Sequence, residues 1–300
     1  MQRFSGAGGR LMAYPAAASA GSLGDLLARP VKQAIAGQVV ALFNDRSRGE
    51  RPVQRRTDGL FGPRAVAWRV HGDVVSMMVG GIAGLMLQML YPPVLAGVWD
   101  HSRFRHDLAG RLRRTARFIA LTTYGSREEA EASIARVRAI HDHVRGTLPD
   151  GTPYAANDPE LLAWVHVAEA TTFLEGWIRY GEPGMSGADR DRYFAEMAVV
   201  GEMLGADPLP RSRAEARAIL HGFRPKLLVD HRVRETARVL LTRRADSPWQ
   251  EPLQRLTQEA GLDLLPGWAR RMHGLPPRLG VPLLRAGTLG VASTLRWAFR

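Results

Sequence analysis

The sequence predicts an all-α protein that folds as a single helical domain. Strand signals are scarce, because no Asn-Gly or Asp-Gly hairpin joins two long alternating runs of β-branched residues. Apolar residues instead recur at helical spacing along most of the chain. Apolar residues make up 45% and charged residues 23% of the 300 residues, a balance that supports one sizeable core.

The first thirty residues are expected to form a disordered, flexible N-terminal segment ahead of a helical domain at residues 31–300. They are rich in Gly, Ala, Ser and Arg and contain no continuous apolar stretch behind a basic start, so a secretory signal is not expected. A second polar stretch at residues 46–58 is expected to be a basic loop.

Eight helices are predicted in chain order, followed by a helical tail that prolines interrupt at residues 252–300. They span residues 30–43, 64–79, 107–124, 127–144, 159–180, 186–204, 211–223 and 230–243. Ser126 and Glu129 have the spacing of a capping box at the start of the fourth helix. Pro159 directly follows Asp158, a pattern typical of a first helical turn.

The most apolar segment, residues 73–99, has the length of a membrane span. Gly80-Gly81 and Pro92-Pro93 divide it into shorter pieces, and Gln88 would need a partner in lipid. We therefore favour a pair of buried core helices, and expect at most membrane contact without a span. The small residues around Gly84 would allow close approach of a neighbouring helix or of a flat ligand.

The formal net charge of +12 comes almost entirely from arginine, since lysine occurs only at Lys32 and Lys226. The arginines are spread along the chain and no zinc-finger, RNP or homeodomain pattern is present, so no nucleic-acid partner is expected. The absence of cysteine excludes disulfides, iron–sulfur clusters, thiolate-ligated haem and cysteine nucleophiles. It is compatible with a cytoplasmic location, which we expect.

Nine histidines are present, but none belongs to an HExxH or Glu-x-x-His pattern. His141 and His143 are two residues apart, so on a helix they face different directions and a shared metal site is not expected. His141 falls on the same helical face as Ile134 and Val137, which would point it inward. There it could bind a ligand, or simply form a hydrogen bond with a core carbonyl.

Seven short motifs between residues 61 and 228 occur in an order that resembles one family of bacterial and fungal oxygenases. The motifs are FGPRAVAWRVHGD, GGIAGLMLQMLYPPVLAGVWDHSRF, RLRRT, YGS, HDHVRG, YAANDPELLAWVH and MLGADPLP. The family includes latex clearing protein, a rubber oxygenase, and the mpaB-type oxygenases of fungal secondary metabolism. The resemblance implies an all-α fold with a globin-like core around haem b.

The resemblance also implies roles for individual residues. His141, followed by Val144, stands at the place of the axial histidine of the iron, and His166 at a second cofactor-binding histidine, unless it is a packed polar residue. Arg111, Arg114 and Thr115 match a catalytic Arg-x-x-Lys-Thr run, with Arg114 in place of the lysine. Arginine stays protonated and cannot readily coordinate iron, so Arg114 would instead bind a propionate or an oxygen species.

These implications predict a haem b-dependent oxygenase that acts on a small apolar substrate, such as an alkene or terpenoid, with dioxygen or peroxide. Glu169 and Glu175 are further candidate acid/base groups on the helix of His166. Two alternatives stay open. The arginines and Thr115 could form a solvated basic helix face, and the protein could be a non-catalytic haem-binding or membrane-associated helical protein.

Overall fold

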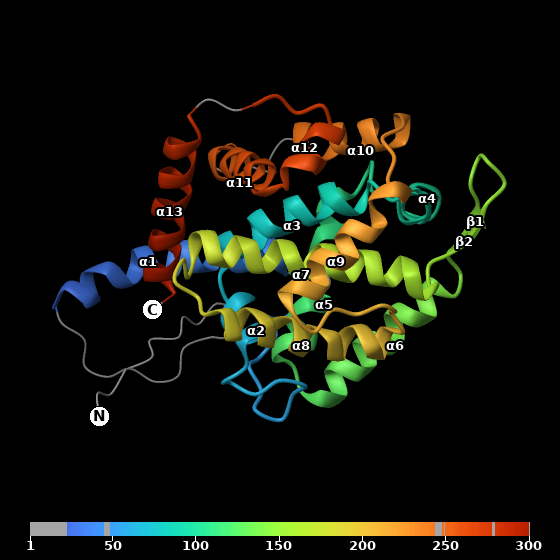
Figure 1. Ribbon diagram of the computed structural model, residues 1–300. Coiled ribbons are helices and arrows are strands. Elements are labelled where there is room, and N and C mark those ends of the chain that lie inside the picture. Colours follow the sequence, from blue (N-terminus) through green and yellow to red (C-terminus); the bar gives the residue numbers. More distant parts are fainter. Residues whose placement is uncertain (1–22, 45–48, 244–247, 249, 278–279, 300) are drawn as a thin grey trace.

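The computed structural model describes residues 23–44, 49–243, 248, 250–277 and 280–299. Within these residues the chain is a bundle of helices with one short hairpin, which confirms the prediction of a mostly helical single domain (Figure 1). The first expected disordered residues, 1–22, lie outside the described residues. Residues 23–30 were expected to belong to the disordered segment, whereas they form the first part of the helix α1 (Leu23–Phe43).

Two helices form the centre of the core: α3 (Val74–Gln88) and α7 (Pro159–Tyr180). They run side by side in the middle of Figure 1 and make the most extensive contact between any two elements. A Cβ atom on Gly80 would lie 2.8 Å from the carbonyl oxygen of Thr172, and one on Gly84 would lie 2.9 Å from its Oγ1. The small residues of α3 thus admit a neighbouring helix, α7, rather than a flat ligand.

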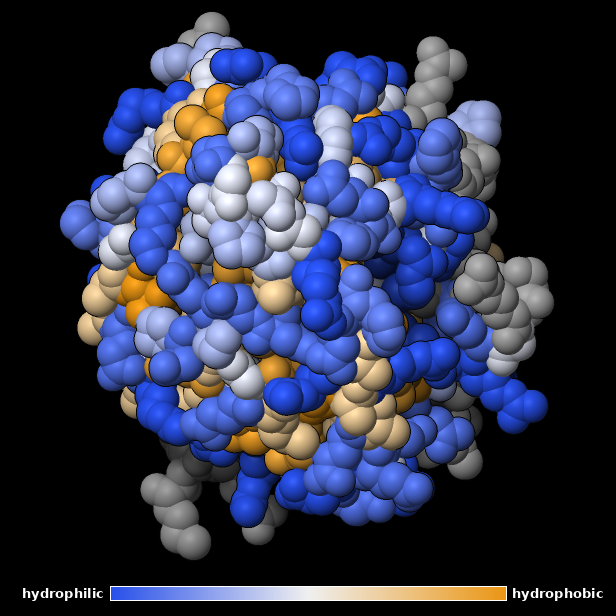
Figure 2. Space-filling view, turned by 90° about the vertical axis from the view of Figure 1, so that its right-hand side faces the viewer, coloured by the Kyte–Doolittle hydropathy of each residue, from blue (hydrophilic) through white to orange (hydrophobic). Residues whose placement is uncertain are grey.

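The apolar segment is bent by 104° between α3 and α4 (Pro92–His101). Nine of the fifteen residues of α3 are buried, as the core interpretation predicts. Among the described residues no single helix is long and apolar enough to cross a membrane, and this bent pair qualifies by length and composition only. The face that carries α4 is mostly hydrophilic, with hydrophobic residues in separate patches (Figure 2).

The predicted helix at residues 64–79 is instead two helices, α2 (Val66–Val70) and α3. The two helices are separated at Asp73, where the backbone is extended. The side chain of Asp73 caps α3 by accepting a hydrogen bond from the backbone amide of Ser76 at 2.8 Å. Gly72 precedes it, and a Cβ there would lie 2.8 Å from the carbonyl oxygen of Trp68. The cap at Asp73 therefore starts a new helix, although the apolar periodicity of residues 64–79 suggested one continuous helix.

Most other predicted helices are confirmed to within two residues. They are α5 (Leu108–Tyr124), α7, α8 (Gly187–Leu204), α9 (Arg213–Phe223) and α10 (His231–Thr242). A side-chain oxygen caps each of them at the residue before the helix begins. The tail forms α11 (Glu251–Leu264), α12 (Gly267–Met272) and α13 (Val281–Ala298), and a short 3-10 turn, η2 (Arg224–Lys226), follows α9.

The helix α6 (Arg127–His141) begins at the predicted capping box, in which Ser126 and Glu129 satisfy each other's backbone amides. It ends three residues earlier than predicted, because residues 145–155 form an antiparallel hairpin. The strands are β1 (Arg145–Thr147) and β2 (Pro153–Ala155), with Gly146 opposite Tyr154. The turn contains Asp150-Gly151, with Gly151 at φ 90°, but strands of three residues were too short to be predicted.

Candidate functional site

His141 is the last residue of α6, on the face that buries Ala130 and Ile134. Its side chain is half-buried, and Nδ1 is fully buried without a hydrogen-bond partner. The hydrogen bond to a core carbonyl that the sequence left open as an alternative is therefore not found among the described residues. The accessible part of the ring lies away from Nδ1.

The surroundings of His141 favour its neutral form. Burial lowers the pKa of the imidazole, the side chain of Asn157 opposes that change, and the positive charge of Arg111 lowers the pKa further. A histidine with a lowered pKa is neutral at pH 7, so one ring nitrogen keeps a free lone pair. His141 therefore has the protonation state that a metal ligand or a general base requires.

The charge of Arg111 acts both on His141 and on a carboxylate of α7. Burial raises the pKa of Glu169, while the Gln88 side chain and the charge of Arg111 hold it down. Burial also lowers the pKa of Arg111, and the charge of Arg114 adds to that shift, whereas Glu169 opposes it. Arg111 of α5 thus lies close enough to interact electrostatically with His141 of α6 and with Glu169 of α7, and Gln88 of α3 interacts with Glu169.

These three side chains are desolvated and yet only half-buried. Each of them is therefore surrounded largely by protein while part of its side chain stays accessible. A few polar groups of this kind among apolar helices are typical of a small-molecule site.

The other two members of the predicted catalytic run point to solvent. The guanidinium of Arg114 is exposed and lies 3.3 Å from the carboxylate of Asp107, at the start of its own helix. The hydroxyl of Thr115 is exposed and donates to the carbonyl of Arg111 at 3.3 Å. Of the three residues that were expected to face His141 together, the structure brings only Arg111 to it.

His166 is buried in α7, and burial lowers its pKa to about 4. Its Nε2 has no hydrogen-bond partner. The ring packs toward α8, where a Cβ atom on Gly201 would lie 3.2 Å from its Cε1. No contact between His166 and His141 is found in the described part of the chain.

Sequence reasoning did not assign a role to Asn157 or to Gln88. Gln88 was visible as the one amide in the apolar segment, and its Nε2 is buried without a partner that meets hydrogen-bond geometry. Asn157 follows the hairpin, so no helical periodicity could have placed it beside His141. Its position depends on how residues 145–155 fold back.

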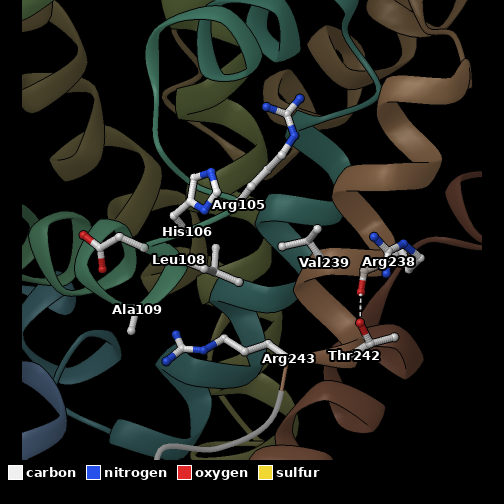
Figure 3. A pocket seen from close by; sticks show the side chains of 9 residues that line it. Arg105, His106, Leu108, Ala109, Arg238, Val239, Thr242 and Arg243 are labelled. Carbon is white, nitrogen blue, oxygen red and sulfur yellow. Dashed lines mark hydrogen bonds between the residues drawn. The ribbon is translucent and has the colours of Figure 1, made fainter.

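A separate pocket of about 280 Å³ lies between the start of α5 and the end of α10 (Figure 3). None of the predicted site residues lines it. Its arginines do not converge on one point: Arg105 stacks on the ring of Trp99 at 3.7 Å, and Glu235 holds Arg238 through two hydrogen bonds of 2.8 and 2.9 Å. We therefore do not treat it as the candidate site.

Within the described ranges no three or more His, Cys, Asp or Glu side chains form a group that could hold a metal ion. A metal held by protein side chains alone is thus unsupported there. A prosthetic group that brings its own equatorial ligands needs only one histidine.

The described residues form a helical protein in which one neutral imidazole interacts with an arginine that also interacts with a buried carboxyl group. Residues 68–297 match the family model described as ER-bound oxygenase mpaB/B'/Rubber oxygenase, catalytic domain. The chain belongs to this family. The match reaches residue 297 in α13, although the resemblance noticed in the sequence covered about residues 61–228. No curated protein and no solved structure matches the chain.

Proposed function

We propose that this protein is a haem b-dependent oxygenase that acts on a small apolar substrate, such as an alkene or terpenoid, with dioxygen or peroxide. Membership in a family of oxygenases supports the oxygenase activity. The observation that carries the cofactor assignment is the neutral, half-buried His141, which interacts with Arg111. The proposal adds a haem-binding crevice beside His141, lined by Arg111 and Glu169. A globin-like arrangement of helices around the haem remains part of this proposal.

The residues present fit a haem. His141 supplies one neutral imidazole, which keeps a lone pair for an axial bond. When bound, the haem supplies the redox chemistry with which oxygenases activate dioxygen or peroxide. The permanent charge of Arg114 excludes it as an iron ligand, and to bind a propionate it would have to leave its ion pair with Asp107.

Arg111 and Glu169 supply the polar groups of the crevice. The guanidinium of Arg111 donates hydrogen bonds and stabilises negative charge that develops on oxygen. The carboxyl group of Glu169, with its raised pKa, can hold a proton and release it within the crevice. The apolar helices around them exclude water and favour an apolar substrate.

Reconstitution with hemin tests the cofactor. The purified protein should take up one equivalent of hemin and develop a Soret band, and His141→Ala should lose that band or shift it to the spectrum of unligated haem. The matched control is His143→Ala, two residues away, whose exposed ring bonds the carbonyl of Ala139 at 2.9 Å. The control should bind hemin like the unaltered protein.

A protein that binds no hemin, or a His141→Ala variant with an unchanged spectrum, would contradict the proposal. Turnover of an alkene or terpenoid panel by the loaded protein, followed as oxygen consumption, then separates an oxygenase from a non-catalytic haem-binding protein. Binding without oxygen consumption on any substrate would favour the latter.

A further inference from the structure

The side chain of Asn157 is clamped to the end of α6 on both sides of His141. Its Nδ2 donates to the carbonyl oxygen of Arg138 at 3.1 Å and to Oδ1 of Asp142 at 2.6 Å. These residues lie three positions before and one position after His141. The loop that carries Asn157 is itself held to the helix end, because the amide of Ala156 donates to the carbonyl of Val144 at 2.8 Å.

This clamp fixes which way the amide of Asn157 points. A carbonyl oxygen and a carboxylate oxygen can only accept, so the atom that faces them must be Nδ2. Turning the amide round would set its oxygen against two other oxygens. Oδ1 therefore points away from both partners, and it is buried without a hydrogen-bond partner.

Nδ1 of His141 is buried and unpartnered as well. A buried acceptor and a buried donor that each lack a partner are both energetically costly. The Asn157 side chain is close enough to act on the imidazole, because a hydrogen-bonding interaction with it raises the pKa of His141. Pairing the two unpartnered atoms with each other would remove both costs.

We propose that Asn157 is the positioning residue of His141: its Oδ1 accepts the Nδ1–H of the ring, fixes that tautomer and leaves Nε2 unprotonated toward the crevice. Metal-ligating histidines commonly donate their other N–H to a fixed acceptor in this way. That Nε2 is the ligating atom rests on the proposed function. The tautomer of His141 does not depend on the proposed function, because it is determined by the protein's own atoms.

The tautomer can be measured in the protein without haem. Long-range ¹H–¹⁵N correlation spectra of protein with ¹⁵N-labelled histidine distinguish the two neutral tautomers, and His141→Ala identifies the signals of residue 141. We expect His141 as the Nδ1–H tautomer. Asn157→Ala should convert it to a mixture or to the Nε2–H form, which an imidazole in water prefers.

Asp142→Ala is the matched control, because it removes one partner of Nδ2 and leaves Oδ1 in place. It should keep the Nδ1–H tautomer. Hemin titration gives a second measurement, in which Asn157→Ala should weaken binding by about 10–100-fold and Asp142→Ala should not.

An Nε2–H tautomer in the unaltered protein would overturn the proposal, even if no Asn157 variant folds. So would an Asn157→Ala variant that keeps the Nδ1–H tautomer. If the tautomers behave as expected but no protein binds hemin, the proposed function fails while the positioning of His141 by Asn157 stands.

Discussion

Arg296 of α13 donates from Nε to the carboxylate of Asp73 at 2.6 Å, which joins residues 223 positions apart in the sequence. Asp73 also caps α3, so one carboxylate both starts the central helix and holds the last helix. Arg296 makes a further hydrogen bond to the carbonyl of Tyr180 at the end of α7. Both ends of this contact lie within the matched residues 68–297 of the family model.

Removing the charge of Asp73 should destabilise the fold. Asp73→Asn keeps an oxygen for the cap but leaves the guanidinium of Arg296, which is 23% exposed, without its carboxylate. We expect a loss of about 1–3 kcal/mol in the free energy of unfolding, and a larger loss for Asp73→Ala, which also removes the cap. Urea unfolding measures both; equal losses would show that the cap contributes nothing.

Two adjacent glycines of α3 should respond differently to alanine. A Cβ on Gly80 would lie 2.8 Å from the backbone oxygen of Thr172 and 2.9 Å from the Cα of Phe173, so Gly80→Ala must push α7 away. We expect it to cost about 1–3 kcal/mol. The nearest atom to a Cβ on Gly81 is 3.8 Å away, so Gly81→Ala should be neutral or stabilising by up to about 1 kcal/mol. Thermal unfolding of the pair checks the contact between α3 and α7.

Removing Arg111 should raise the pKa of His141. The guanidinium lowers that pKa, so Arg111→Met should allow the imidazole to bind a proton at higher pH, whereas Arg111→Lys should keep most of the effect. NMR titration of the His141 ring measures this shift. Arg114→Met is the control: its side chain is 58% exposed, and it should leave the His141 titration unchanged. An identical titration in Arg111→Met and the unaltered protein would refute the proximity of these two groups.

The stability of the protein should fall as the pH drops below about 6.5. Burial lowers the pKa of His71 to about 3 and that of His166 to about 4. Just below pH 6.5 these histidines therefore bind protons in the unfolded chain but stay neutral in the folded chain. The stability these histidines contribute is therefore complete above pH 6.5 and decreases below it, by about 1.4 kcal/mol per pH unit for each histidine.

His166→Gln isolates one of these contributions. Between pH 6.5 and about 4, the free energy of unfolding of this variant should fall with pH less steeply than that of the unaltered protein. His143→Gln, at an exposed position, should show the slope of the unaltered protein. Urea unfolding at several pH values gives the slopes. Parallel curves for His166→Gln and the unaltered protein would mean that His166 is not held neutral by the fold.

The helices and most of their ends could be predicted, because their signals lie within a few residues of each other. Asp107, Ser126 and Asp158 each accept a hydrogen bond from an amide two or three positions ahead, a contact that needs no tertiary structure. The family also follows from short motifs in a fixed order. His141 could be selected as a candidate because its spacing from Ile134 predicts the inner face of a helix, and Ile134 is 3% exposed.

The composition of the site could not be predicted in the same way. Arg111 and Arg114 are three positions apart on one helix, and nothing in their spacing says that the first meets Glu169 while the second pairs with Asp107. Asn157 comes to His141 only because a hairpin of short strands folds back to the end of α6.

By itself, the sequence determined that this chain is helical, where most of its helices begin, and to which family it belongs. Hydrogen bonds between residues two to four positions apart and the periodicity of apolar side chains are properties of the chain before it folds. Only the tertiary structure decided that α7 fills the glycine face of α3, that Arg111 turns to His141, and that Asn157 holds the end of α6. These contacts join residues at least 15 positions apart, and such contacts exist only once the helices have packed.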